Sequence, residues 1–287
     1  MIRMIVSDCD GTLLNNDSEI DEETILAVKR FQDAGGIFML ATGRNRWDAA
    51  YVTDKIQNCV LNCDDGAALF DEDGKELMIH KIGKDRIKAM NDLCIHYDLP
   101  VIYHGINGSC ITWELNDFKE RAIRQIKSVY TPAMAEDIFD WVYGGSHDRY
   151  GADISDIIEE NIIRMQPVFI PENDYELVCS ECKRIFKDMH INIGSFLNNI
   201  EITSKESDKG KTVKEYCRLK GIKEDEVAVI GDSINDISMF RLFENSYCVR
   251  SGQLEAKKAA KHIIDGNDEL GVAKLMHKVC DKSDQNV

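Results

Sequence analysis

Residues 2–12 read IRMIVSDCDGT, an apolar run that ends abruptly in two carboxylates, Asp8 and Asp10. A short apolar segment that stops at polar residues is typical of a central strand in a parallel sheet. The acids follow the strand two residues apart, where the chain can splay them in different directions. One carboxylate could attack an electrophile while the other moves a proton, and hard oxygen ligands suit Mg²⁺. An ordinary strand-end turn with solvated acids is the alternative.

Strands and helices alternate outward from this segment. We expect a helix at 22–34, a strand at 37–41, a helix at 46–56 and a third strand from residue 59. The same alternation resumes near residue 203, with expected helices at 209–220, 235–243 and 253–261 and strands at 227–230, 247–249 and 262–264. Such βαβ repetition predicts a Rossmann-like, doubly wound parallel sheet.

The intervening region has a different pattern. It combines expected helices at 84–97 and 172–188 with expected strands at 100–104, 109–113 and 162–170, and a long helical and loop stretch at 116–160. Adjacent strand pairs favour an antiparallel sheet in a separate α+β unit. We therefore predict a catalytic core of residues 1–82 and 203–287, interrupted by an inserted cap domain at 83–202. Residues 281–287 are expected to fray.

Composition and charge narrow the class of protein. The formal charge of −16 disfavours nucleic acid and anionic membranes as partners. No run approaches the roughly 18 to 20 apolar residues that cross a bilayer, and the N-terminus is too acidic for a secretory leader. The ten cysteines are expected to be reduced, including Cys179 and Cys182, which lack two further zinc ligands at matching spacing. We expect a cytoplasmic protein, monomeric or weakly self-associating.

Polar groups follow three of the expected strands directly: Asp8, Thr42 and Asp232. Ligands of open parallel sheets bind outside the carboxyl ends of the strands, so these groups should meet. Asp232 and Asp236 are four residues apart, and Asn235 could cap a helix beginning there. Lys209 opens another helix and offers a point charge for a phosphate oxygen. Taken alone, each of these segments is also compatible with a helix cap or a solvated surface.

The order of these motifs resembles the haloacid dehalogenase superfamily of phosphatases, over about residues 2–82 and 203–278. Within it the chain looks like the Cof-type branch, which carries a large α/β cap between the Thr and Lys motifs. The resemblance implies an Asp8 nucleophile that forms an aspartyl-phosphate, and Asp10 as the acid and base. It also implies phosphoryl-binding groups, which are Cys9 (through its backbone N–H), Thr42, Gly43, Arg44, Lys209 and Asn235.

The same resemblance implies a Mg²⁺ cofactor. Its ligands would be the Asp8 and Asp232 carboxylates and the main-chain carbonyl of Asp10, with Asp236 in the outer shell. Two segments depart from the family pattern. Asp65-Gly66-Ala67 stands where Asn-Gly-Ala is frequent, and Arg250-Ser251-Gly252 stands where Gly-Asn-Ala is frequent. The first change puts a carboxylate where an amide is tolerated, and so bears on the choice of substrate.

The expected function is hydrolysis of small phosphorylated metabolites, with sugar phosphates as the favoured class. A sugar phosphomutase or phosphotransferase would share the nucleophile and the cap, so it stays open as an alternative. A signalling receiver domain also uses Asp, Thr and Lys on a parallel sheet, but its acid pair is adjacent and its chain is shorter. A catalytically inactive sugar-phosphate binder is disfavoured because every catalytic residue type is retained.

Overall fold

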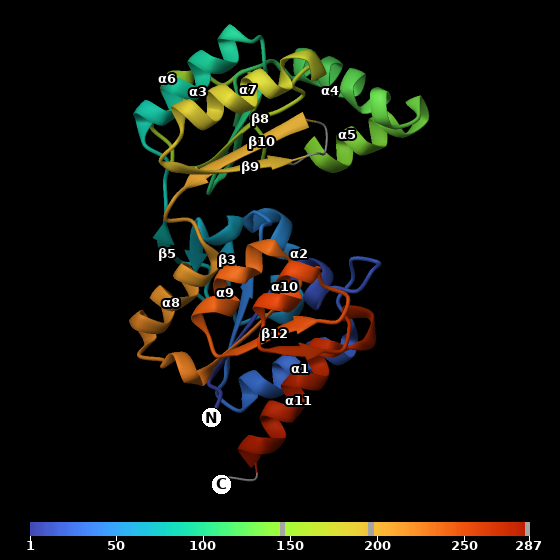
Figure 1. The fold of residues 1–287 in the computed structure, drawn as a ribbon, viewed down its shortest axis with the longest axis vertical. Coiled ribbons are helices and arrows are strands. Elements are labelled where there is room, and N and C mark those ends of the chain that lie inside the picture. The colour runs from blue at the N-terminus through green and yellow to red at the C-terminus, as the bar shows by residue number, and fades with distance from the viewer. Residues whose placement is uncertain (144–146, 195–197, 285–287) are drawn as a thin grey trace. The chain divides into compact units, whose positions relative to one another are not determined.

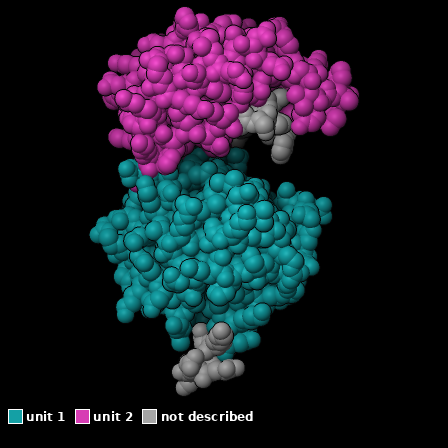
Figure 2. Space-filling view, viewed as in Figure 1, with its two compact units in different colours: residues 1–79, 206–287 teal, residues 80–205 magenta. Residues whose placement is uncertain are grey.

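A computed structural model describes residues 1–143, 147–194 and 198–284. The chain forms two compact units, one of residues 1–79 and 206–287 and the other of residues 80–205 (Figure 2). We call them the core unit and the second unit. Each crossing between the units lies three residues from the boundary expected from the sequence.

The core unit is built on an eight-stranded sheet with the order β13-β12-β11-β1-β2-β3-β4-β5 (Figure 1). The six strands from β13 to β3 are parallel, and β4 and β5 extend the sheet in antiparallel fashion. The strands are β1 (Met4–Ser7), β2 (Ile37–Ala41), β3 (Cys59–Cys63), β4 (Ala68–Phe70), β5 (Glu76–Ile79), β11 (Val227–Gly231), β12 (Asn245–Val249) and β13 (His262–Ile264). This mostly parallel α/β sheet confirms the predicted fold class.

Helices connect the parallel strands and bury their apolar residues. They are α1 (Glu22–Asp33), α2 (Arg46–Ile56), α8 (Lys209–Lys220), α9 (Ile237–Leu242), α10 (Leu254–Ala259) and α11 (Gly271–Asp284). Apolar side chains of α8, α9 and α10 pack on one set of alternate strand residues, which includes Met4 and Val6. Helix α1 packs against α2 and α11. The central strands are therefore buried, as their continuous apolar sequences require.

The second unit is an antiparallel five-stranded sheet with helices, in the order β7-β6-β8-β10-β9. Its strands are β6 (Val101–Gly105), β7 (Gly108–Ile111), β8 (Ile162–Pro167), β9 (Met189–Gly194) and β10 (Asn199–Ser204). Its helices are α3 (Lys84–His96), α4 (Leu115–Val129), α5 (Ala135–Tyr143), α6 (Ile154–Ile157) and α7 (Glu172–Ile185). Helices α3, α6 and α7 cover one face of the sheet (Figure 1). Apolar residues of α4 and α5 form a second cluster with Ile102 and Ile111.

Several elements differ from the sequence-based expectation. The hairpin of β4 and β5 was not predicted, because its strands have only three and four residues. Strand β10 belongs to the second sheet and pairs with β8 and β9, so the core pattern resumes only at α8. Residues 281–284 are helical rather than frayed, because α11 continues to Asp284, and Arg30 of α1 pairs with Asp281.

All ten cysteines are buried and free, including Cys179 and Cys182 of α7. Within the described residues, no helix is both long enough and apolar enough to span a bilayer.

Candidate active site

Four neighbouring parallel strands end at one edge of the core sheet, and each is followed by polar residues. Asp8 follows β1, Thr42 follows β2, Asp65 lies just past β3, and Asp232 follows β11. Strand β1 pairs with both β2 and β11, and β2 pairs with β3, so the sheet itself brings these segments together. The backbone N–H of Asp8 donates to the carbonyl of Ile230, which fixes the first motif beside the last.

Lys209 lies at the centre of this edge and is fully buried. Its Nζ lies 2.7 Å from Oδ1 of Asp8 and 2.8 Å from Oδ1 of Asp236. Asp208 caps α8 by accepting from the N–H of Lys211, so the lysine enters the site from the first turn of a fixed helix. Burial opposes the charged ammonium, but the surrounding carboxylates outweigh it and raise the pKa of Lys209 above its ordinary value. The lysine is therefore a permanent cation.

The carboxylates near Lys209 crowd one another. Oxygens of Asp8, Asp232 and Asp236 all lie within 4.8 Å of one another. Burial, followed by the charge of Asp236, raises the pKa of Asp8 well above its usual range, and Lys209 opposes that rise. Burial and Asp236 also raise the pKa of Asp232. A cation bound among these oxygens would relieve the repulsion that adds to the effect of burial on both pKa values.

The hydrogen bonds of Asp236 distinguish it from the other two acids. Its Oδ2 accepts from the N–H groups of Asp232 and Ser233 at 2.9 and 3.0 Å, while its Oδ1 accepts from Lys209. Both oxygens are therefore engaged, and Asp8 and Asp232 are better placed to give oxygen ligands to a hard divalent cation. This arrangement fits a metal held directly by Asp8 and Asp232 and supported by Asp236.

Glycine at position 11 permits the close approach of the first motif to Asp232. Gly11 has a φ of +74°, and a Cβ built there would lie 2.9 Å from Oδ2 of Asp232. The neighbouring Thr12 hydroxyl donates to Oδ1 of Asp232 at 3.2 Å. Any larger residue at position 11 would be strained and would displace a candidate metal ligand.

Asp10 lies on the exposed side of the site and is paired with Arg44. The guanidinium donates through Nε and Nη2 to the two carboxylate oxygens, at 2.8 and 2.6 Å. Arg44 was predicted to hold a phosphoryl group, and the structure places its charge on Asp10. The backbone N–H of Arg44 donates to Oγ1 of Thr42, which joins both residues of this predicted motif.

The remaining predicted residues lie around the same edge. Nδ2 of Asn235 donates to Oδ1 of Asp65 at 2.9 Å, and a Cβ added to Gly43 would lie 3.3 Å from both Asp65 oxygens. Cys9 is buried, and burial together with Asp10 raises the pKa of its thiol to about 12. Burial and the raised pKa both disfavour a reactive thiolate at this position.

The structure adds Thr12 and Asn62 to the predicted site residues, and it places Asp65, which the sequence analysis connected only with the choice of substrate, beside Lys209. Asp65 lies 3.9 Å from Nζ of Lys209, and the buried Asn62 donates to the carbonyl of Lys209. The sequence did contain an indication of this place for Asp65, because it lies just past a strand, as Asp8, Thr42 and Asp232 do. Arg250, which also departs from the family pattern, forms surface ion pairs with Asp265 and Glu269.

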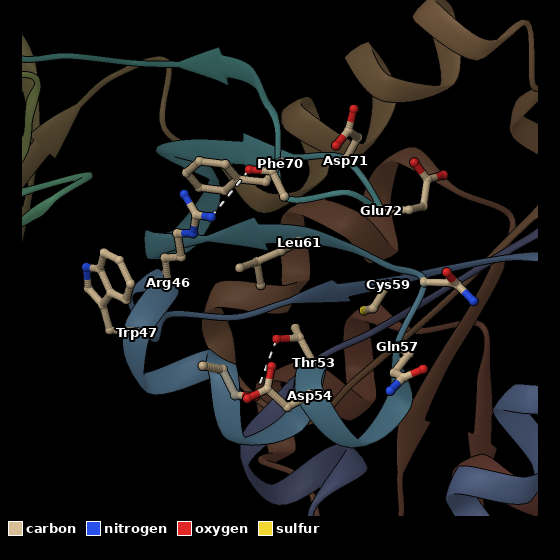
Figure 3. A pocket seen from close by; sticks show the side chains of 13 residues that line it. Arg46, Trp47, Thr53, Asp54, Gln57, Cys59, Leu61, Phe70, Asp71 and Glu72 are labelled. Atoms are coloured by element: carbon tan, nitrogen blue, oxygen red, sulfur yellow. Dashed lines mark hydrogen bonds between the residues drawn. The ribbon is translucent and has the colours of Figure 1, made fainter.

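A pocket of about 650 Å³ in the core unit is lined by none of these residues. It lies between α2 and strands β3 and β4, with Arg46 over the ring of Phe70 (Figure 3). It contains no gathering of carboxylates around a cation comparable to the sheet edge.

Comparison with known proteins identifies the family. The sequence profile of the haloacid dehalogenase-like hydrolases matches residues 5–276. The chain belongs to this family. As a haloacid dehalogenase-like hydrolase it is an enzyme, and its carboxylate-rich sheet edge lies within the matched region.

Several relatives match this hydrolase over nearly the whole of both chains. A Bacillus subtilis protein named 5-amino-6-(5-phospho-D-ribitylamino)uracil phosphatase is 25% identical, over 95% of this chain and 96% of its own. A haloacid dehalogenase-like hydrolase from Bacteroides thetaiotaomicron has a TM-score of 0.79 at 20% identity, covering 97% of this chain and 100% of that one. A Thermotoga maritima crystal structure has a TM-score of 0.82 at 18% identity, covering 97% of each chain. These two structures share the fold of this hydrolase.

Proposed function

We propose that this hydrolase is a Mg²⁺-dependent phosphatase that removes phosphate from small metabolites through a covalent acyl phosphate (aspartyl-phosphate) on Asp8. Sugar and sugar-alcohol phosphates are the favoured substrates. One observation carries the proposal: the buried ammonium of Lys209 lies between Asp8 and Asp236, with Asp232 beside them. The name of the B. subtilis relative, which gives a ribityl phosphate as substrate, supports the substrate class.

The charges of the site suit attack by a carboxylate on a phosphate dianion. Two negative groups must approach each other, and a bound Mg²⁺ would supply the neutralising charge, held by Asp8, Asp232 and the main-chain carbonyl of Asp10. Lys209 supplies a second positive charge beside the carboxylate of Asp8, to whose Oδ1 it donates. Fixed charges of this kind cost no reorganisation during the reaction, and each is commonly worth about 3 kcal/mol in the barrier.

Two successive displacements at phosphorus account for hydrolysis, with Asp8 as the nucleophile in the first and the leaving group in the second. Asp8 attacks phosphorus and the substrate oxygen leaves with a proton from Asp10; water then attacks phosphorus, its proton returns to Asp10, and Asp8 is freed. In the described structure Arg44 donates to both carboxylate oxygens of Asp10. Asp10 must therefore exchange Arg44 for the leaving oxygen when it acts as the acid. We propose that Thr42, Gly43, Asn235 and the Cys9 backbone hold the phosphoryl oxygens.

We also propose that the inserted second unit chooses among substrates and that the protein works in the cytoplasm without nucleic-acid partners, as a monomer or weak oligomer. The buried free thiols and the net charge of −16 support these assignments.

A panel of phosphorylated metabolites incubated with Mg²⁺ tests the function, with phosphate release as the readout and Asp8→Asn as the matched variant. We expect wild-type release on at least one sugar phosphate and a loss of at least about 10³-fold in the variant. Full activity of Asp8→Asn would show that Asp8 is not the nucleophile. Return of the phosphoryl group to sugar rather than to water would favour the phosphomutase alternative.

A further inference from the structure

The unusual residue at the active-site edge is Asp65, which the phosphate-transfer chemistry does not require. Its Oδ1 accepts from Asn235 and lies 3.9 Å from Nζ of Lys209. The loop that carries it is fixed: the N–H of Asp65 donates to the carbonyl of Thr42. A Cβ on the next residue, Gly66, would lie 2.5 Å from the backbone of Asp208, so the loop packs directly on the start of α8.

Apart from Asp232, which the proposed metal would hold, the charge of Asp65 is the least compensated of the described carboxylates around Lys209. The side chains of Lys209 and Asp236 are fully buried and that of Asp8 is 8% exposed, whereas that of Asp65 is 43% exposed. Asp10 is also exposed, but Arg44 neutralises it with a forked pair. Among the residues that the structure describes, the carboxylate of Asp65 accepts from the neutral amide of Asn235 and lies 3.9 Å from Lys209, which two closer carboxylates already hold.

The formal charge of these joined side chains leads to the same conclusion. With every group ionised, five carboxylates and two cations give −3, and one divalent cation reduces this to −1. An asparagine at position 65 would bring the loaded site to neutrality. The negative charge that remains in this count therefore equals the charge that Asp65 contributes, and that side chain is partly open to solvent.

We infer that Asp65 is a specificity-determining residue. It disfavours substrates that carry a negatively charged group in addition to the phosphate, and it weakens binding of the phosphate product. Phosphomonoesters with neutral or cationic leaving groups are the preferred class. This inference rests on the proposed function. Because a unit charge several ångströms away and partly screened by water changes affinity by about fivefold, the effect should be moderate and sensitive to salt.

The decisive variant is Asp65→Asn. Asparagine tolerates the left-handed φ of +53° and keeps an oxygen to accept from Asn235, so the variant removes charge alone. Asp65→Gly also suits this φ and removes the acceptor as well. Asp33→Asn is the matched control, because it removes the same charge from the exposed end of α1.

Two measurements test the inference. Calorimetric titration with inorganic phosphate, with and without Mg²⁺, should show about fivefold tighter binding to Asp65→Asn and Asp65→Gly than to wild type and Asp33→Asn, a difference that shrinks in about 0.5 M salt. The second measurement is kcat/KM for glycerol 3-phosphate, phosphoethanolamine and 3-phosphoglycerate. The wild type should be biased against 3-phosphoglycerate, which carries a carboxylate in addition to its phosphate. Asp65→Asn should reduce that bias about fivefold.

The possible failures are separable. Unchanged phosphate affinity and an unchanged bias in both Asp65 variants would overturn the role of Asp65 while leaving the phosphatase intact. Absence of turnover on every phosphomonoester would overturn the proposed function, and the phosphate titration would still decide whether Asp65 repels anions.

Discussion

The two sheets of this hydrolase hold their polar side chains in different ways. In the core unit, charged residues lie beyond the ends of parallel strands and gather around Lys209. In the second unit, polar residues stand on the sheet face opposite α3, α6 and α7. There His104 of β6 bonds to Gln166 of β8 at 2.8 Å, and Ser109 of β7 lies 3.2 Å from the other ring nitrogen of His104.

Polar residues therefore have two different roles in this molecule. Those at the core edge create an electric field for a ligand, and those on the face of the second sheet stabilise the fold. The edge of a parallel sheet brings together segments that are distant in sequence, and an excess of charge there can be directed at a ligand. Neighbours on an antiparallel face satisfy one another in pairs, and His104 is kept neutral. Changes at the core edge should therefore alter chemistry and ligand affinity, and also stability where a buried charge loses its partner, while changes at the face should alter stability alone.

The largest effect is expected for Asp10→Asn. Loss of the acid should lower turnover by about 10²- to 10⁴-fold while Mg²⁺ affinity largely survives, because only the main-chain oxygen at position 10 is assigned to the metal. Asp232→Asn is the matched comparison and should weaken Mg²⁺ binding strongly. Titration calorimetry with Mg²⁺ checks both variants, and equal losses of affinity would contradict the assignment.

A second large effect is expected for Lys209→Met, this time on stability. The change leaves the carboxylates of Asp8 and Asp236 buried without their cation, which commonly costs about 3–5 kcal/mol. Lys214→Met removes one partner of an exposed ion pair with Glu224 and should cost less than about 1 kcal/mol. Urea unfolding of both variants measures the difference, and similar losses would show that Lys209 is not the centre of the core edge.

A moderate effect of pH is expected at the face of the second sheet. Burial, followed by the charge of Arg164, lowers the pKa of His104 to about 3, while the unfolded chain binds a proton near pH 6.5. Stability from this site is therefore complete above about pH 6.5 and is lost as the pH falls toward 3. Between pH 7 and 5 the loss should be about 1–2 kcal/mol.

Hydrogen exchange of β6 and β8 as a function of pH measures this change in the second unit. His104→Gln should flatten the pH dependence, whereas a change at His277, which pairs with Glu23 in the core unit, should leave it as in wild type. An equally steep profile in His104→Gln would assign the titration to another group.

The smallest effect is expected for Ser109→Ala, which removes one neutral hydrogen bond to His104. The cost should be about 0.5–1.5 kcal/mol in the unfolding free energy, without a change in kcat on any substrate. A fall in kcat comparable to that of a core-edge variant would contradict the structural role assigned to this face.

The same contrast explains how far the sequence could predict the molecule. Strand-end residues such as Asp8, Thr42 and Asp232 could be predicted to converge because parallel topology leaves them one edge on which to meet. The burial of Lys209 and the hold of Arg44 on Asp10 depend on side-chain directions that spacing does not encode. His104 lies in β6, at the end of the strand expected at 100–104, but spacing could not predict its pairing with Gln166, which comes from a strand 62 positions away.

The buried thiols can serve as native reporters of local opening in each unit. Four of them lie in the second unit, namely Cys94, Cys110, Cys179 and Cys182, and the other six lie in the core unit. Because a shielded thiol reacts with an alkylating reagent only when its surroundings open, peptide-resolved labelling of the native enzyme would time the breathing of each half separately. Ligand-induced tightening could then be followed in the unmodified chain, without introducing any probe.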